Sequence, residues 1–272
     1  MSFGETSVNL LVLMFLSGWV IGLVATFLGV GGGILLVPFL IFLFPKQGVH
    51  PSCSIHLAIG TSLLVIFLRA IPAGLSYHRR NLVIGQAVLP LAVASIGGIL
   101  VGTTVADLLP GEILKKLFAL LLFLAALRMF LSKPPQAGES SPRMGLWALS
   151  VVGSIAGFFS ALLGIGGGLV SIPLMSYFLM FPAEKLAGTS SATIIFTSLA
   201  GVLGYVFIGQ DVAQLPTYSL GYVHWAAAIP LALGGIIAAP LGVYLNHKLD
   251  VSIFKKSFAV VLVIVGVQML FL

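Results

Sequence analysis

Two glycine-rich stretches are the strongest candidates for chemistry in this sequence. The first is Gly29-Val30-Gly31-Gly32-Gly33, and the second, 135 positions later, is Gly164-Ile165-Gly166-Gly167-Gly168. Each stretch interrupts an apolar run, so it should break a membrane helix and leave backbone N–H groups free where the next helix begins. Such N–H groups, together with the helix dipole, favour an anion. The glycines that we expect to bind substrate are Gly29, Gly31, Gly32, Gly33, Gly164, Gly166, Gly167 and Gly168.

The first stretch is not a nucleotide-binding motif. The G-x-G-x-x-G pattern would need a glycine at position 34, which is Ile34, and no Gly-Lys-Ser/Thr follows for a P-loop. The absence of these motifs argues against direct coupling to ATP. A purely structural kink is the alternative to a ligand-facing break, and the double occurrence of the break favours the ligand.

Hydroxyl groups form a second repeated pattern. Gly60-Thr61-Ser62 and Gly188-Thr189-Ser190-Ser191 each place hydroxyls beside a glycine near the beginning of an apolar helix. These side chains could donate hydrogen bonds to a desolvated anion, and we count both segments as substrate-binding candidates. The alternative is that they bond their own backbone or a neighbouring helix, as Ser and Thr often do in membrane helices.

Few ionisable residues lie near the expected membrane interior, and each is a candidate for a coupling or charge role. His56 and Glu184 occupy equivalent positions, four residues before each Gly-Thr-Ser, and either could titrate during transport. Both could instead lie at helix ends in the interface. Arg69 could attract an anionic substrate, or its side chain could extend to the basic end at residues 78–80.

The sequence lacks the residue sets that enzymes and metal sites use. No helix carries a pair of carboxylates, and neither H-E-x-x-H nor G-x-S-x-G occurs. The single cysteine, Cys53, excludes an internal disulfide and a zinc cluster. We therefore expect no catalytic residues, no metal site and no cofactor, and an intramembrane enzyme is the least favoured interpretation.

The composition fixes the kind of element that must position these residues. Of the 272 residues, 59% are hydrophobic and only 7% are charged, which is too little charge for a water-facing surface. The net charge of +6 comes from Lys and Arg scattered at the ends of apolar runs, so we expect no nucleic-acid partner. The sequence predicts an all-α integral membrane protein. Helical segments are expected at about 8–28, 34–44, 54–77, 82–109, 113–131, 144–163, 169–181, 186–210, 221–246 and 251–272.

The order of the motifs indicates a duplication. Residues 1–131 form the first transmembrane repeat, 132–143 a polar cytoplasmic linker, and 144–272 the second repeat. With small shifts in the offset, Tyr77 corresponds to Tyr205 and Pro90 to Pro230. If each glycine break turns the chain back, nine Lys and Arg face one side and three the other, whereas continuous segments give seven against five. The charge count therefore favours two inverted repeats with about eight to ten membrane segments. The pieces after the glycines are short, and whether they span or re-enter stays open.

The glycine and hydroxyl motifs, in the order given above, resemble both repeats of the TauE/SafE sulfite exporter family over nearly the whole chain. The resemblance implies a secondary transporter of small sulfur-containing anions, sulfite or an organosulfonate, that works as an exporter in the cell (inner) membrane. Its partners would be the anion and the lipid bilayer, with the oligomeric state open. We expect alternating access at the interface of the repeats, with proton coupling as a hypothesis. An uncoupled anion channel and a transporter of another small organic anion are the alternatives.

Overall fold

The computed structural model describes residues 3–131, 142–212, 215–248 and 251–271, and it is built almost entirely of helices. The first half contains α1 (Phe3–Leu28), α2 (Gly33–Leu43), a 3-10 turn η1 (Phe44–Gln47), α3 (Pro51–Arg79), α4 (Gly85–Leu108) and α5 (Gly111–Leu131). The second half contains α6 (Leu146–Leu163), α7 (Gly168–Tyr177), α8 (Ala183–Ile208), strands β1 (Ser219–Leu220) and β2 (Val223–His224), α9 (Trp225–Lys248) and α10 (Val251–Phe271). The linker predicted at 132–143 lies mostly outside the described residues.

The expected helices are all present, but the one predicted at 221–246 begins later, at residue 225. Residues 221–224 belong to an antiparallel hairpin in which Ser219 pairs with His224, and the helix begins only at Trp225. Gly221 and Tyr218 both adopt positive φ angles, 52° and 67°, which a helix does not allow. The hairpin is closed by a hydrogen bond from the N–H of Trp225 to the carbonyl of Tyr218.

Among the described residues, six helices are long and apolar enough to cross a membrane. They are α1 (from Val8), α3, α4, α6, α8 and α9, whereas α2 and α7 are shorter apolar helices. Large apolar side chains such as Leu89, Val93 and Leu100 on α4 are more than 60% exposed. A surface of this kind suits lipid rather than water. The chain is therefore a multi-pass helical membrane protein.

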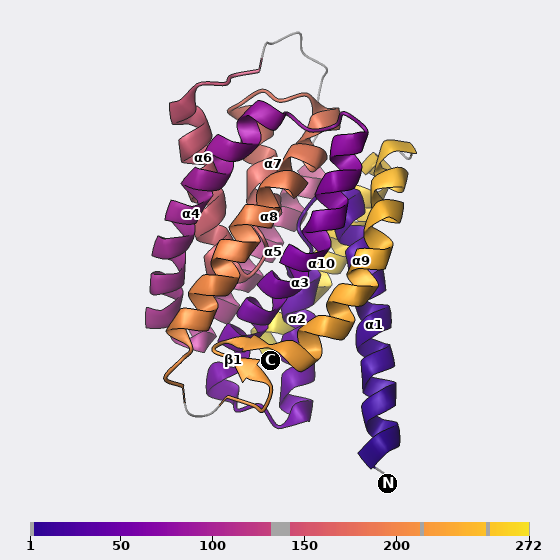
Figure 1. Ribbon diagram of the computed structural model, residues 1–272, viewed down its shortest axis with the longest axis vertical. Helices are drawn as coiled ribbons and strands as arrows, with labels where there is room; N and C mark the ends of the chain where they lie inside the picture. Colours follow the sequence, from indigo (N-terminus) through magenta and orange to yellow (C-terminus); the bar gives the residue numbers. More distant parts are fainter. Residues whose placement is uncertain (1–2, 132–141, 213–214, 249–250, 272) are drawn as a thin grey trace.

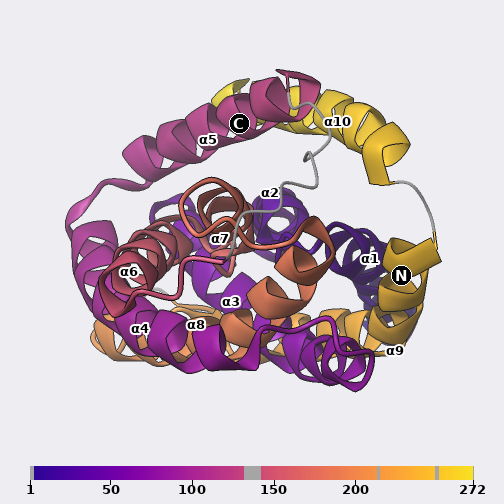
Figure 2. The ribbon, with the colours of Figure 1, turned by 90° about the horizontal axis from the view of Figure 1, so that it is seen from above.

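The helices of the two halves pack in corresponding pairs. α1 packs along α9, and its counterpart α6 packs along α4, while α3 and α8 contact each other at the centre. α5 and α10 lie side by side in a separate layer (Figure 2). Glycines permit the close crossings: a Cβ on Gly18 would strike the carbonyl of Leu231, and one on Gly153 would lie 2.5 Å from the carbonyl oxygen of Leu91.

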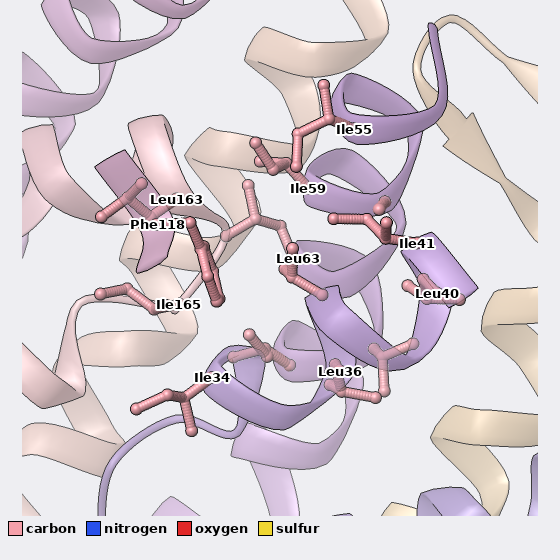
Figure 3. Close-up of a cluster of buried hydrophobic side chains, with 14 of the residues drawn as sticks. Ile34, Leu36, Leu40, Ile41, Ile55, Ile59, Leu63, Phe118, Leu163 and Ile165 are labelled. Atoms are coloured by element: carbon pink, nitrogen blue, oxygen red, sulfur yellow. The ribbon is translucent and has the colours of Figure 1, made fainter. Parts of the chain in front are cut away.

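A buried apolar cluster fixes α2 in the interior. Figure 3 shows side chains of α2 against those of α3, with Phe118 of α5 and Leu163 and Ile165 of the second half nearby. Val37 and Leu40 have no exposed surface, and Ile34 has 1%. The start of α2, which carries the first glycine break, is thus held deep in the protein.

Candidate functional site

Glycine is required at both helix breaks because the backbone there is left-handed. The φ angles of Gly29, Gly31 and Gly32 are 70°, 86° and 87°. At the second break, Gly164, Gly166 and Gly167 have φ angles of 64°, 71° and 82°. Side-chain-bearing residues rarely adopt this region, so the chain can end one helix and start another here only with glycine.

The two breaks meet each other inside the protein. A Cβ on Gly33 would strike the carbonyl oxygen of Gly164, and one on Gly168 would lie 2.8 Å from the carbonyl oxygen of Gly29. Likewise, a Cβ on Gly31 would strike the carbonyl oxygen of Ile165. All the predicted glycines are buried. The structure therefore brings two stretches that are 135 residues apart in the sequence into direct backbone contact.

Hydroxyls from the Gly-Thr-Ser segments reach across to the opposite break. The Ser62 hydroxyl lies 2.8 Å from the carbonyl oxygen of Gly164 and 2.7 Å from that of Ile59, so its one proton is shared between them. At the equivalent place, the Ser190 hydroxyl lies 3.4 Å from the carbonyl oxygen of Gly29 and 3.1 Å from the Ser171 hydroxyl. A serine of each half therefore contacts the first glycine of the break in the other half.

The threonines of these segments hold the loops before α9 and α4. Thr61 accepts a hydrogen bond of 3.0 Å from the N–H of His224, and Thr189 accepts one of 3.0 Å from the N–H of Ile84. The glycines beside them allow the close approach, because a Cβ on Gly60 would strike the carbonyl oxygen of Tyr222, and one on Gly188 that of Leu82. Ser191 is buried as well, with 6% of its surface exposed. The hydroxyls of four residues therefore bond backbone groups of the opposite half: Thr61, Ser62, Thr189 and Ser190.

Two tyrosines, which the sequence reasoning assigned only to the repeat pattern, support the helix ends before the breaks. Tyr77 donates a 2.9 Å hydrogen bond to the carbonyl of Thr26, and Tyr205 donates a 2.8 Å hydrogen bond to the carbonyl of Ala161. Neither tyrosine has any exposed surface. The carbonyls at a helix end lack partners within the helix, so each tyrosine supplies one. The correspondence of Tyr77 and Tyr205 between the two halves was the sequence feature that could have indicated a shared role.

Arg69 lies at the first break rather than at the membrane surface. Only 4% of the residue is exposed. Its Nη1 donates a 2.6 Å hydrogen bond to the Thr26 hydroxyl, and its Nη2 donates to the carbonyl of Gly31. Its Nε is buried and has no acceptor within the described ranges. The structure thus joins Arg69 to the glycine break and does not direct its side chain to the basic helix end.

The equivalent residues His56 and Glu184 have different surroundings. His56 is 6% exposed, its Nε2 lies 3.0 Å from the carbonyl of Ala106, and its ring stacks on Tyr222 with 5.1 Å between centroids. Its Nδ1 is buried without a partner in the described part of the chain. Glu184 is exposed in the first turn of α8. The interfacial interpretation therefore suits Glu184, whereas His56 is enclosed.

His224 caps α9 from the hairpin. Its Nδ1 accepts a 3.1 Å hydrogen bond from the N–H of Ala227, which requires the neutral form of that nitrogen. Burial lowers the pKa of His224 below its ordinary value, because desolvation penalises the charged ring. Within residues that the structure describes, no three His, Cys, Asp or Glu side chains are grouped to hold a metal ion.

Helices that cross a membrane, two of them interrupted by apposed buried glycine turns, define a multi-pass membrane protein of the transporter class. The family model described as sulfite exporter TauE/SafE matches residues 14–269, and the chain belongs to this family of membrane transporters.

Relatives of nearly equal length support this assignment. A probable membrane transporter protein of Haemophilus influenzae is 30% identical over 262 residues, covering 95% of this chain and 97% of the relative. Probable membrane transporter proteins of Methanocaldococcus jannaschii and Bacillus subtilis (YunE) are 29% and 26% identical, each covering 96% of this chain and 96% and 97% of the relative. No solved structure matches the chain significantly.

Proposed function

We propose that this protein is a secondary transporter of small sulfur-containing anions, sulfite or an organosulfonate, and that the anion binds where the two glycine breaks meet. The observation that carries the proposal is the pair of buried helix starts, one from each half, held against each other. Helix starts favour anions through their N–H groups and their dipole. The family description supports sulfite export as the activity.

The first break supplies hydrogen-bond donors for such an anion. In the described chain, the backbone N–H groups of Gly31, Gly32, Gly33 and Ile34 have no backbone acceptor. Unsatisfied N–H groups are costly at membrane depth, since no water is there to accept from them. An oxyanion would supply the acceptor. The N–H groups of Gly166, Gly167 and Gly168 are the corresponding candidates at the second break.

The two halves, 1–131 and 144–272, are proposed to be inverted repeats. The exchange of contacts supports this relation: Ser62 reaches Gly164 as Ser190 reaches Gly29. In Figure 1, the short helix α2 lies in the lower half of the molecule and the short helix α7 in the upper half. The uneven distribution of Lys and Arg along the sequence favours the same arrangement, with the linker on the cytoplasmic side of the inner membrane.

Alternating access would follow from separating the two breaks. In the closed conformation the hydroxyls of Thr61, Ser62, Thr189 and Ser190 bond backbone groups across the repeats, and each such bond in a membrane protein contributes only about 0.6 kcal/mol on average. Movement of one repeat can therefore break a few of them and free the hydroxyls for the anion. His56, with a ring nitrogen available for a proton, is the candidate for coupling, ahead of the exposed Glu184.

Flux into proteoliposomes tests this function. Labelled sulfite, sulfoacetate and a carboxylate control are offered at two external pH values. A coupled transporter gives saturable uptake of a sulfur oxyanion that increases with a proton gradient. Conductance without saturation or counterflow would indicate an anion channel. If only the carboxylate is taken up, the protein transports another class of small organic anion.

A further inference from the structure

We propose that Arg69 is the counter-charge of the transported anion, so that the charge is recognised at the first break and not at the second. This inference rests on the proposed function and adds to it a charge-selecting residue. The substrate class that it implies is a small oxyanion with one negative charge.

The first observation is that Arg69 is buried with no acidic partner among the described residues. The residue is 4% exposed, and its acceptors are the neutral Thr26 hydroxyl and the carbonyl of Gly31. Among the described residues, the one salt bridge joins Lys115 and Glu112. A buried charge without an opposite charge is strongly unfavourable. A functional counter-ion explains why the chain retains an arginine here.

The second observation is that the guanidinium lies at the positive end of a helix. Gly32 is the N-cap of α2, and a Cβ on Gly32 would be only 3.3 Å from Arg69 Nη2. The dipole of α2 places partial positive charge at this end, where the N–H groups of Gly33 and Ile34 also lack a backbone acceptor. Two positive features side by side repel each other. An oxyanion between them would accept from both and remove the repulsion.

The third observation is that small residues make room for this side chain. A Cβ on Gly22 of α1 would be 3.3 Å from Arg69 Cδ, and one on Gly235 of α9 would be 3.0 Å from it. The crossing of α1 and α9 is therefore shaped around the arginine stem. The Nε–H is buried and has no acceptor in the described part of the chain, so this donor of the guanidinium remains available to a ligand.

The fourth observation is that the second break has no such charge. By the repeat offsets, Thr197 takes the place of Arg69, and Ser95 that of Gly235. The hydroxyls of Thr197 and Ser95 lie 2.9 Å apart. The Ser160 hydroxyl, close to the second break, is buried and has no partner among the residues that the structure describes. The second break is thus polar but uncharged. One guanidinium balances one negative charge, which favours a singly charged sulfonate or hydrogen sulfite over a dianion.

The test compares an anion with a neutral molecule of similar shape. The purified full-length protein is heated in detergent with methanesulfonate, dimethyl sulfone or sulfate, and the unfolding temperature is measured. Wild-type protein should be stabilised by methanesulfonate, less by sulfate at equal concentration, and not by dimethyl sulfone. Equal stabilisation by the sulfone would overturn the proposal, and equal stabilisation by sulfate would overturn the preference for one charge.

Variants then assign the effect to Arg69. Arg69→Gln should weaken the apparent affinity for methanesulfonate by roughly ten- to a hundredfold, the effect of losing a hydrogen-bonded charge. Arg69→Lys, which keeps the charge without the planar fork, should lose less. Arg128→Gln is the matched control, because it also removes one positive charge but from an exposed position on α5. It should behave as wild type.

A merely structural role for Arg69 gives a different result. Because no described acidic residue is buried with it, Arg69→Gln should keep or raise the unfolding temperature measured without anion. A lowered temperature together with an unchanged methanesulfonate effect would make Arg69 structural and overturn the proposal. If Arg69→Gln does not fold, the comparison of methanesulfonate with dimethyl sulfone on wild-type protein decides.

Failure of this inference is distinguishable from failure of the proposed function. Wild-type protein that neither binds nor transports methanesulfonate, sulfite or any other small anion would contradict the function itself. If both wild-type protein and Arg69→Gln take up methanesulfonate equally well, the transporter stands and only the role of Arg69 is wrong.

Discussion

Gly33→Ala tests the contact between the two breaks without straining the backbone. Gly33 has no positive φ angle, so alanine fits its conformation. The new Cβ would strike the carbonyl oxygen of Gly164, and it would lie 2.5 Å from the Cα of Ile165. That distance is about 0.9 Å short of the 3.4 Å at which ordinary contact begins. Both obstructing groups are backbone, so the two breaks must move apart.

The expected cost follows from the overpacking. An extra methyl group in a well-packed interior destabilises the structure by about 1–3 kcal/mol. If the cost falls on the closed conformation, the population of conformations with separated breaks rises by roughly 5- to 150-fold. Ile165, which has no exposed surface, can report this change after replacement by cysteine.

The assay is the rate at which a thiol reagent modifies Ile165→Cys in a Cys53→Ser background. Gly33→Ala should increase the rate of thiol modification by roughly 5- to 150-fold and should change anion flux. Gly97→Ala in α4 is the control, because its Cβ would meet no atom within 4 Å beyond its own stretch of helix, and it should leave both quantities unchanged. Wild-type labelling and wild-type flux in a well-inserted Gly33→Ala protein would refute the contact between the breaks.

Two further predictions concern the polar groups around the breaks. Ser62→Ala and Ser190→Ala should each lower the free energy of unfolding by roughly 0.6 kcal/mol and at most about 1.7. Ser62→Ala should have the larger effect, because the Ser62 hydroxyl lies 2.8 Å from the opposite break and the Ser190 hydroxyl 3.4 Å. Thr104→Ala, at an exposed position, is the control and should have no effect. A denaturation series in which Ser190→Ala costs more than Ser62→Ala would disprove this assignment. His56→Gln should abolish the pH dependence of flux, because an amide does not titrate near neutral pH, and an unchanged pH profile would remove His56 as the proton carrier.

The sequence could predict the two helix breaks and the hydroxyl segments near them, because both follow from local residue patterns. Closely spaced glycines inside an apolar segment indicate a left-handed turn, because glycine alone adopts positive φ angles without a steric penalty, and Gly32 and Gly167 both adopt them. The repeat offset made the two turns equivalent, but it could not say that they touch. That contact depends on how α3 and α8 cross, which the sequence does not encode locally.

The partners of the polar side chains were beyond sequence reasoning for a similar reason. Whether Thr61 donates to an anion or accepts from the N–H of His224 depends on a loop 163 residues away. The direction taken by the Arg69 side chain was also open, because it depends on the small residues Gly22 and Gly235 that α1 and α9 place against its stem. The hairpin before α9 was missed because Tyr222 and Val223 continue the apolar pattern of the helix that follows.

The most direct test of the central claim is anion uptake by wild-type protein beside Gly32→Val and Gly167→Val in proteoliposomes. Both glycines have φ angles above 80°, so valine should distort one break in each variant while the helices still insert. Saturable uptake of sulfite or methanesulfonate by wild-type protein, and its loss in both variants, is the predicted result. Wild-type uptake in either well-inserted variant would contradict a transport site formed by the paired breaks.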